Sequence, residues 1–111
     1  MDITGWQAQL RKGAAELVVL AALERGELYG LEILERVGGV GGVVNEGTLY
    51  PLLSRLERDA KLTSRWSLDA GSAHPRKYYR LSAEGEALLV AMRAHWSSFR
   101  AAVTDIVEPP L

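Results

Sequence analysis

The stretch from Asn45 to Lys61 places groups that bind nucleic acid at helical spacing. Four leucines recur at steps of three and four residues, which predicts one aliphatic helix face held in a core. The other faces carry hydroxyl, phenol and guanidinium groups, which can bind phosphates and the edges of DNA bases. This stretch therefore predicts a DNA recognition helix with Thr48, Tyr50, Arg55 and Arg58 as candidate contacts.

The first turn of this helix is ambiguous in the sequence. Asn45 is suited to cap the helix and is also a candidate DNA contact, and Glu46 is favourable at the positive end of the helix dipole. Pro51 is tolerated in a first turn, so the regular helix is expected to begin nearer Gly47 or Thr48.

The structural alternatives for these contacts stay open. Thr48 could cap the helix, Tyr50 could pack on the following hairpin, and Arg55 and Arg58 could lie on a solvated face with Glu57 as a local partner.

A basic hairpin is predicted after Lys61. Residues Leu62 to Leu68 alternate in polarity, residues 69–75 have the composition of a turn, and Arg76 to Leu81 alternate again. A hairpin behind a helix-turn-helix is the wing of a winged helix, whose tip reaches phosphates or a minor groove. The candidate wing contacts are His74, Arg76 and Lys77.

Charge is unevenly distributed along the 111 residues. The chain has a net charge of −1, but residues 55–80 hold seven basic and three acidic side chains, a local charge of +4. A basic patch on an acidic body can bind a polyanion, although a charge of this size also arises by chance.

Two helices are expected before the recognition helix. The first runs from about Thr4 to Arg25, with Gly13 as a bend or break, Gly26 at its end and a deeply buried stretch from Ala14 to Leu23. The second runs from about Tyr29 to Val37, and the Tyr29 hydroxyl is a candidate phosphate contact, against a role in the core. Glycine-rich residues 38–44 lack the Gly-Lys-Ser/Thr ending of a phosphate-binding loop and are read as a connection.

A long helix capped by Ser82 completes the chain. Apolar side chains step along it at heptad-like spacing from Leu88 to Ile106, a seam that favours packing on a partner subunit. The first helix offers a counterpart in Ile3 and Trp6, although these could instead fold back onto the core. Residues 1–82 are thus expected to form the winged helix and residues 83–111 the dimerisation helix and tail. The candidate interface or effector-binding residues are Trp6, Leu10, Leu88, Met92, Trp96, Phe99 and Val103.

Several classes of protein are disfavoured. The chain has no cysteine, so disulfides, thiol catalysis and cysteine zinc sites are excluded. His74 and His95 stand alone, so no metal is assigned, and no catalytic triad or carboxylate pair indicates an enzyme. Neither a membrane span nor a secretion signal is evident, and a cytoplasmic location is expected.

Two motifs resemble the PadR family of bacterial transcriptional regulators. They are Gly47-Thr48-Leu49-Tyr50-Pro51 with Arg55-Leu56-Glu57, and Pro75-Arg76-Lys77-Tyr78-Tyr79-Arg80-Leu81-Ser82 with Glu84-Gly85. The run Tyr29-Gly30-Leu31-Glu32-Ile33 is similar to the family's second-helix motif, and the single C-terminal helix resembles its short-chain subfamily.

This resemblance implies a winged-helix homodimer joined by its N- and C-terminal helices. It also implies a repressor of a roughly palindromic operator, released by a small and commonly aromatic effector. Two departures from the family pattern affect the DNA end of the molecule: Ala60 stands where glycine is usual, and Val44-Asn45-Glu46 replaces the usual serine or proline. The rival hypothesis is a winged-helix module that binds protein and not DNA.

Overall fold

The computed structural model describes residues 1–39, 42–68 and 74–111. Their elements follow in the order α1 (Thr4–Ala22), β1 (Leu28–Tyr29), α2 (Gly30–Val37), α3 (Glu46–Arg58), β2 (Leu62–Ser67), β3 (Arg76–Leu81) and α4 (Ala83–Val107). A mainly helical chain with a small antiparallel sheet confirms the predicted winged-helix fold class.

The core forms where α1, α2 and α3 meet the sheet and the start of α4. The predicted burial of the second half of α1 is confirmed, since Val19, Leu20 and Leu23 are almost inaccessible. Ile33 of α2 and Leu89 of α4 join the same cluster, together with the four leucines of α3. The periodicity of the aliphatic residues thus identified most of the core.

The first helix differs from the expectation at two points. α1 runs without a break through Gly13 and ends at Ala22, not Arg25. One glycine inside a helix costs only about 1 kcal/mol, which the packing of the flanking apolar residues offsets. Gly26 has a φ of +147°, a conformation that side chains disfavour, so this glycine serves the turn after the helix and not the helix end itself.

The sheet has a third strand that the sequence pattern did not predict. β1 pairs with β3, so the strand order is β1-β3-β2, with Leu28 opposite Tyr79 and Tyr29 opposite Tyr78. Tyr29 is extended, and α2 therefore begins at Gly30 and not at Tyr29. A strand of two residues is too short to show alternating polarity in the sequence. Only its pairing with β3 defines it.

The hairpin is confirmed in the described residues. β2 and β3 pair in antiparallel register from Leu62 opposite Leu81 to Ser67 opposite Arg76. Most of the predicted turn, residues 69–73, lies outside the described residues, as do residues 40 and 41 of the glycine-rich connection.

The recognition helix begins at Glu46, earlier than expected, so Pro51 lies inside it. The proline removes one helical hydrogen bond, the one that would reach the Gly47 carbonyl. Gly47 is exposed, so water can satisfy that carbonyl. The predicted cap is confirmed: the Asn45 side-chain oxygen accepts a hydrogen bond of 3.0 Å from the Thr48 backbone N–H.

A tight corner joins α3, the wing and α4. Ala60 has a φ of +61°, and the Ala60 and Lys61 N–H groups donate to the carbonyls of Glu57 and Leu56 at 3.0 and 2.8 Å. This pattern is a Schellman motif, whose left-handed residue is usually glycine. The corner therefore keeps the conformation that glycine favours although alanine occupies it.

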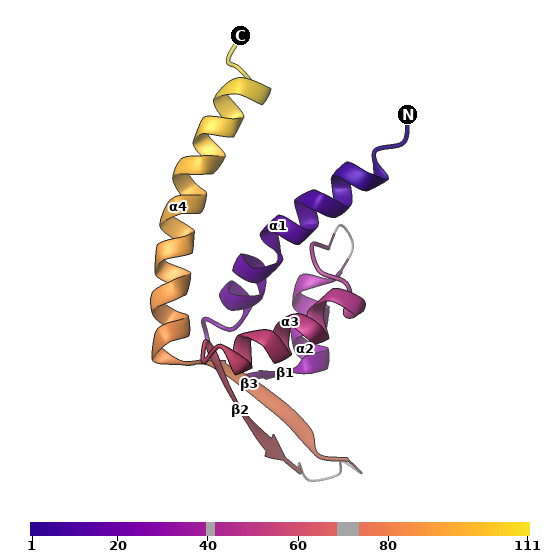
Figure 1. Cartoon of the computed structure of the whole chain (residues 1–111), viewed down its shortest axis with the longest axis vertical. Coiled ribbons are helices and arrows are strands. Elements are labelled where there is room, and N and C mark those ends of the chain that lie inside the picture. Colours follow the sequence, from indigo (N-terminus) through magenta and orange to yellow (C-terminus); the bar gives the residue numbers. More distant parts are fainter. Residues whose placement is uncertain (40–41, 69–73) are drawn as a thin grey trace.

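The start of α4 is bound to this corner. The Ser82 hydroxyl donates to the Ala60 carbonyl at 2.6 Å and accepts a hydrogen bond of 3.0 Å from Gly85, which confirms Ser82 as the cap. A Cβ on Gly85 would lie 2.0 Å from the Lys61 carbonyl oxygen, so only glycine fits there. Figure 1 shows α1 and α4 spreading apart as they leave the core on the side opposite the wing.

Candidate nucleic-acid interface

The four leucines of α3 hold the recognition helix on the core. Leu49, Leu53 and Leu56 are fully buried and Leu52 nearly so. The opposite face is exposed along one line, at Gly47, Pro51, Ser54 and Arg58. The helix is thus anchored on one side and open on the other, the arrangement that insertion into a DNA groove requires.

Serine 54 was not among the predicted contacts. It lies on the exposed line between Pro51 and Arg58, where its hydroxyl is accessible. The α-helical spacing of Gly47, Ser54 and Arg58 could have identified it.

The N-terminal candidates of α3 have different surroundings. Asn45 is occupied as the helix cap, while the Thr48 side chain is exposed. Tyr50 packs on the start of α2, since a Cβ at Gly30 would lie 2.8 Å from the Tyr50 ring. The residue as a whole is still 38% exposed.

The two arginines of α3 differ in what surrounds them. Arg58 is exposed, whereas Arg55 turns toward α1, with its guanidinium nitrogens 3.5 Å from Glu16 and 3.7 Å from Asp59. Pairs of this length at a partly exposed site contribute little to stability. The Arg55 guanidinium can therefore exchange these carboxylates for a phosphate at small cost.

Glu57 links the recognition helix to both strands of the wing. Its carboxylate accepts hydrogen bonds from the Ser64 hydroxyl on β2 and, at 2.9 Å, from the Lys77 ammonium on β3. The Ser64 hydrogen bond and the Lys77 charge hold the pKa of Glu57 below its ordinary value of 4.5. The hydrogen bond with Glu57 likewise raises the pKa of Lys77 above 10.5.

Pairing of Glu57 with Arg55 or Arg58 was the structural alternative for those arginines, and the carboxylate instead binds Ser64 and Lys77. This cluster also places Lys77, a predicted wing contact, against the recognition helix. The Glu57–Lys77 ion pair joins α3 to the wing and holds the lysine beside the recognition helix.

The other face of the sheet carries alternating aromatic and guanidinium groups. The Arg76 guanidinium lies 4.6 Å from the Tyr29 ring centre, Tyr29 meets Tyr78 edge to face at 5.5 Å, and Arg65 lies 4.8 Å from Tyr78. The Arg65 side chain also binds the Glu27 carboxylate, with 2.9 Å between Nε and its oxygen. Tyr29 is therefore part of a surface layer on the sheet and not of the core, and His74 is exposed where the chain enters β3.

A second surface lies between α1 and α4, far from the wing (Figure 1). A groove of about 860 Å³ is lined there by Leu10, Met92, Trp96 and Phe99, with His95 stacked on Phe99 at 6.1 Å. Leu88 and Met92 also contact the core, while Trp96, Phe99 and Val103 are 44%, 54% and 39% exposed. Ile3 and Trp6 are 49% and 61% exposed, so they do not fold back onto the core of this chain.

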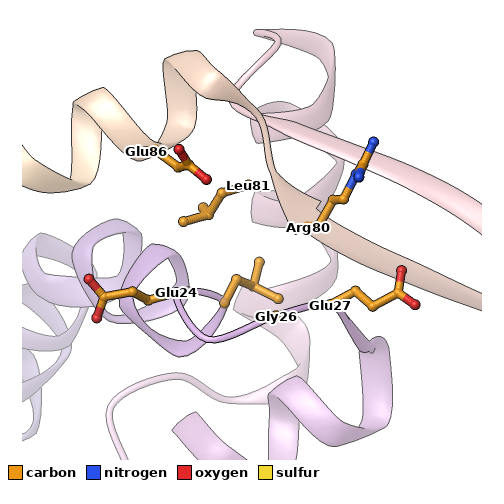
Figure 2. A pocket seen from close by; sticks show the side chains of 7 residues that line it. Glu24, Gly26, Glu27, Arg80, Leu81 and Glu86 are labelled. Carbon is orange, nitrogen blue, oxygen red and sulfur yellow. The ribbon is translucent and has the colours of Figure 1, made fainter.

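A smaller hollow, of about 470 Å³, lies where the end of α1 meets β3 and the start of α4. Figure 2 shows the carboxylates of Glu24 and Glu27 directed to opposite sides of it. Glu24 binds Arg93 of α4 at 2.7 Å and Glu27 binds Arg65, so these carboxylates already have partners. Two of the four charged residues that line the hollow, Glu24 and Glu27, are thus engaged in ion pairs with Arg93 and Arg65.

The described residues contain no group of three or more histidine or acidic side chains that could hold a metal ion. Their helices also lack the combination of length and apolar character that crossing a membrane requires.

An anchored recognition helix, a basic wing and a projecting C-terminal helix together define a winged-helix protein of the kind that reads DNA. The model of the PadR-like family of transcriptional regulators matches residues 19–91. The chain belongs to this family, which confirms the resemblance seen in its motifs and the prediction that it is a regulator and not an enzyme.

Individual relatives of known sequence or structure support the same family assignment. The transcriptional regulator Rv3488 of Mycobacterium tuberculosis is 33% identical over 85 residues, which are 77% of this chain and 78% of that protein. The crystal structure of a PadR family regulator from Eggerthella lenta is 32% identical with a TM-score of 0.81, covering 97% of this chain and 94% of the other. A PadR-like transcription factor from Bacteroides fragilis is 34% identical with a TM-score of 0.73, covering 93% and 99% of the two chains.

Proposed function

We propose that this regulator is a homodimeric repressor that binds a roughly palindromic operator in the cytoplasm. The observation that carries the proposal is the apolar surface of α1 and α4. Trp6, Leu10, Phe99 and Ile106 are each more than half exposed, and they lie on the two helices that project from the core. Large apolar residues gathered on one side of a small protein favour association with a partner.

A second copy is the partner that fits both helices. In a symmetric dimer the same surface serves both subunits, so α1 of one protomer can cover α4 of its partner. Residues 83–111 then act as the dimerisation element and residues 1–82 as the DNA-binding unit. Two recognition helices related by a twofold axis read two inverted half-sites, which makes the operator palindromic.

The DNA-contact set follows from the exposed face of α3 and from the wing. Arg58 and Thr48 are assigned to the major groove, and Tyr50 and Arg55 to its edges. Asn45 and Tyr29 lie near the flanking phosphates. His74, Arg76 and Lys77 contact the backbone or the minor groove from the wing. A dimer seated in this way represses by excluding the transcription machinery from the same DNA.

The groove between α1 and α4 is proposed as the effector site. Its volume of about 860 Å³ is in the range of small-molecule pockets, and Trp96 and Phe99 offer flat apolar surfaces to an aromatic ring. A ligand there would alter the packing of α4 against the partner, and with it the spacing of the two recognition helices.

The first test is DNA binding by the purified protein. A labelled duplex from the region upstream of the protein's own coding sequence is titrated at several salt concentrations and compared with a random duplex. Specific binding that weakens steeply with salt supports the proposal, because phosphate contacts release counterions. Weak binding that does not distinguish the two duplexes, or none, would favour the rival protein-interaction module.

A charge-matched pair of variants locates the contact. Arg58→Ala is expected to weaken binding and to lower the salt slope by about one unit. Arg25→Ala, in the exposed turn after α1, removes the same charge outside the proposed DNA contacts and dimer helix, and is expected to bind DNA as the wild type does. Equal losses in the two variants would indicate a general charge effect and remove the recognition role from α3.

A further inference from the structure

Two large apolar side chains of the wing lie outside the hydrophobic core. Trp66 on β2 is 65% exposed and Leu68, just after this strand, is 66% exposed. A solvent-exposed tryptophan on a narrow hairpin contributes little to the stability of the fold. Its position therefore indicates which binding partner it can contact.

The strand register shows which way Trp66 faces. Trp66 lies opposite Lys77, two residues along from Ser64, which lies opposite Tyr79. Residues two apart on a strand share a face, so Trp66 and Lys77 continue the face that begins with the buried Leu62. The hairpin therefore runs from core to solvent along one continuous face.

This face is the one that looks toward the recognition helix. Ser64 and Lys77, which flank Trp66, both bind the Glu57 carboxylate on α3. Trp66 thus lies beside the contacts that join α3 to the wing, in the corner that the two elements form. Figure 1 shows β2 and β3 diverging from α3 as they leave the corner at the end of this helix.

The corner holds cationic groups beside its apolar surface, and one of them, Lys77, is shared with the Glu57 carboxylate. The Lys77 ammonium lies 5.9 Å from the centre of the Trp66 indole, and Arg58 is exposed on the neighbouring helix. A DNA strand offers the matching chemistry, because its phosphates are anionic while its deoxyribose rings present C–H groups.

We propose that the Trp66 indole, with Leu68 beside it, packs against deoxyribose rings of the operator backbone while Lys77 faces the adjoining phosphate. This inference rests on the proposed DNA-binding function. When α3 occupies a major groove and the wing reaches the neighbouring minor groove, the backbone between the two grooves must cross the corner where Trp66 lies. The contact adds affinity without reading a base, because every nucleotide presents the same sugar.

The test compares Trp66→Ala, Trp66→Phe and the wild type in DNA titrations by fluorescence anisotropy. The duplex is the upstream fragment, and the titrations are repeated over a range of salt concentrations. Leu31→Ala removes an exposed apolar side chain from α2 that belongs to neither the proposed DNA contacts nor the dimer surface; it is the control and is expected to bind as the wild type does.

Trp66→Ala is expected to bind roughly tenfold more weakly, the order associated with burying an aromatic side chain. Trp66→Phe is expected to lose less, because phenyl retains part of the apolar surface. The salt slope should not change, since no charge is removed. Wild-type affinity in Trp66→Ala overturns the proposal, and so does a lower salt slope, which would mean that the residue acts through Lys77.

A direct readout does not depend on how well the alanine variant folds. The protein labelled with 5-fluorotryptophan has three tryptophans, and the fluorine signal of Trp66 is assigned by its absence in Trp66→Phe. Adding the duplex should shift this signal, and a signal unaffected by saturating DNA overturns the contact.

Sedimentation of Trp66→Ala shows whether Trp66 contacts DNA or a second copy of the protein. A loss of self-association would show that the residue packs on a second copy, and would also overturn the contact. If the wild-type protein binds no duplex at all, the DNA-binding proposal itself fails, a result distinct from normal DNA binding by Trp66→Ala.

Discussion

Replacing Ala60 by glycine should stabilise the protein. Ala60 holds a φ of +61°, where a residue with a Cβ is strained by about 1–2 kcal/mol. Its side chain is exposed, so glycine removes no buried contact. Glycine also gains conformational entropy in the unfolded chain, which offsets about 0.4–1 kcal/mol of this relief.

The expected net gain in the free energy of unfolding is therefore about 0.5–1 kcal/mol. For a domain of this size such a gain raises the melting temperature by a few degrees, roughly 2–6 °C. Thermal and urea unfolding followed by circular dichroism measure it. Both are run at one protein concentration, because self-association alters apparent stability.

The matched control is Ala87→Gly, an exposed position within α4 where the backbone is helical. Glycine there should lower the free energy of unfolding by about 0.5–1 kcal/mol. Ala60→Gly that is neutral or destabilising, while Ala87→Gly behaves as expected, would refute the assignment of strain to this corner.

Four further changes test other parts of the fold. Asn45→Ala should lower the free energy of unfolding by about 1 kcal/mol in urea titration, and Asn45→Ser, which can still cap, should lose much less; equal losses would remove the cap from the account. Gly85→Ala should cost at least about 2 kcal/mol, since its Cβ would meet the Lys61 carbonyl oxygen at 2.0 Å; wild-type stability would contradict that close approach. The pKa of Glu57 is lowered in the folded state, so its contribution to stability is present above about pH 4.5 and is lost as the pH falls through the folded pKa. Glu57→Gln should therefore melt below the wild type at neutral pH, with a gap that closes in acid; a gap independent of pH would argue against the ion pair. Trp96→Ala should raise the dissociation constant of the dimer in sedimentation, and an unchanged constant would exclude Trp96 from the interface.

The sequence predicted those features that depend on local periodicity. The spacing of Leu49 to Leu56 identified the buried face of α3, because side chains three and four apart share a face of any helix. Alternation identified β2 and β3, and residue type identified the caps Asn45 and Ser82. The DNA-contact and dimer residues chosen from these patterns stay predictions, since each depends on a partner.

Contacts between distant segments could not be read in this way. β1 exists only because Leu28 and Tyr29 pair with β3, about fifty residues away. Glu57 could have paired with neighbouring arginines, yet the hairpin places Lys77 against it at 2.9 Å. Tyr50 packs against Gly30 because α2 and α3 cross where that residue lacks a side chain.

By itself, then, the sequence determined the four helices and the hairpin, the buried face of α3 and the family. The tertiary structure decided the surroundings of the side chains near the recognition helix: it linked Glu57 to the wing, turned Arg55 toward α1, and left Arg58 and Trp66 exposed, as the proposed DNA contacts require. The physical reason is that helical and strand periods are set by neighbouring residues. The partner of a charged or aromatic side chain is set by the packing of elements that lie far apart in the chain.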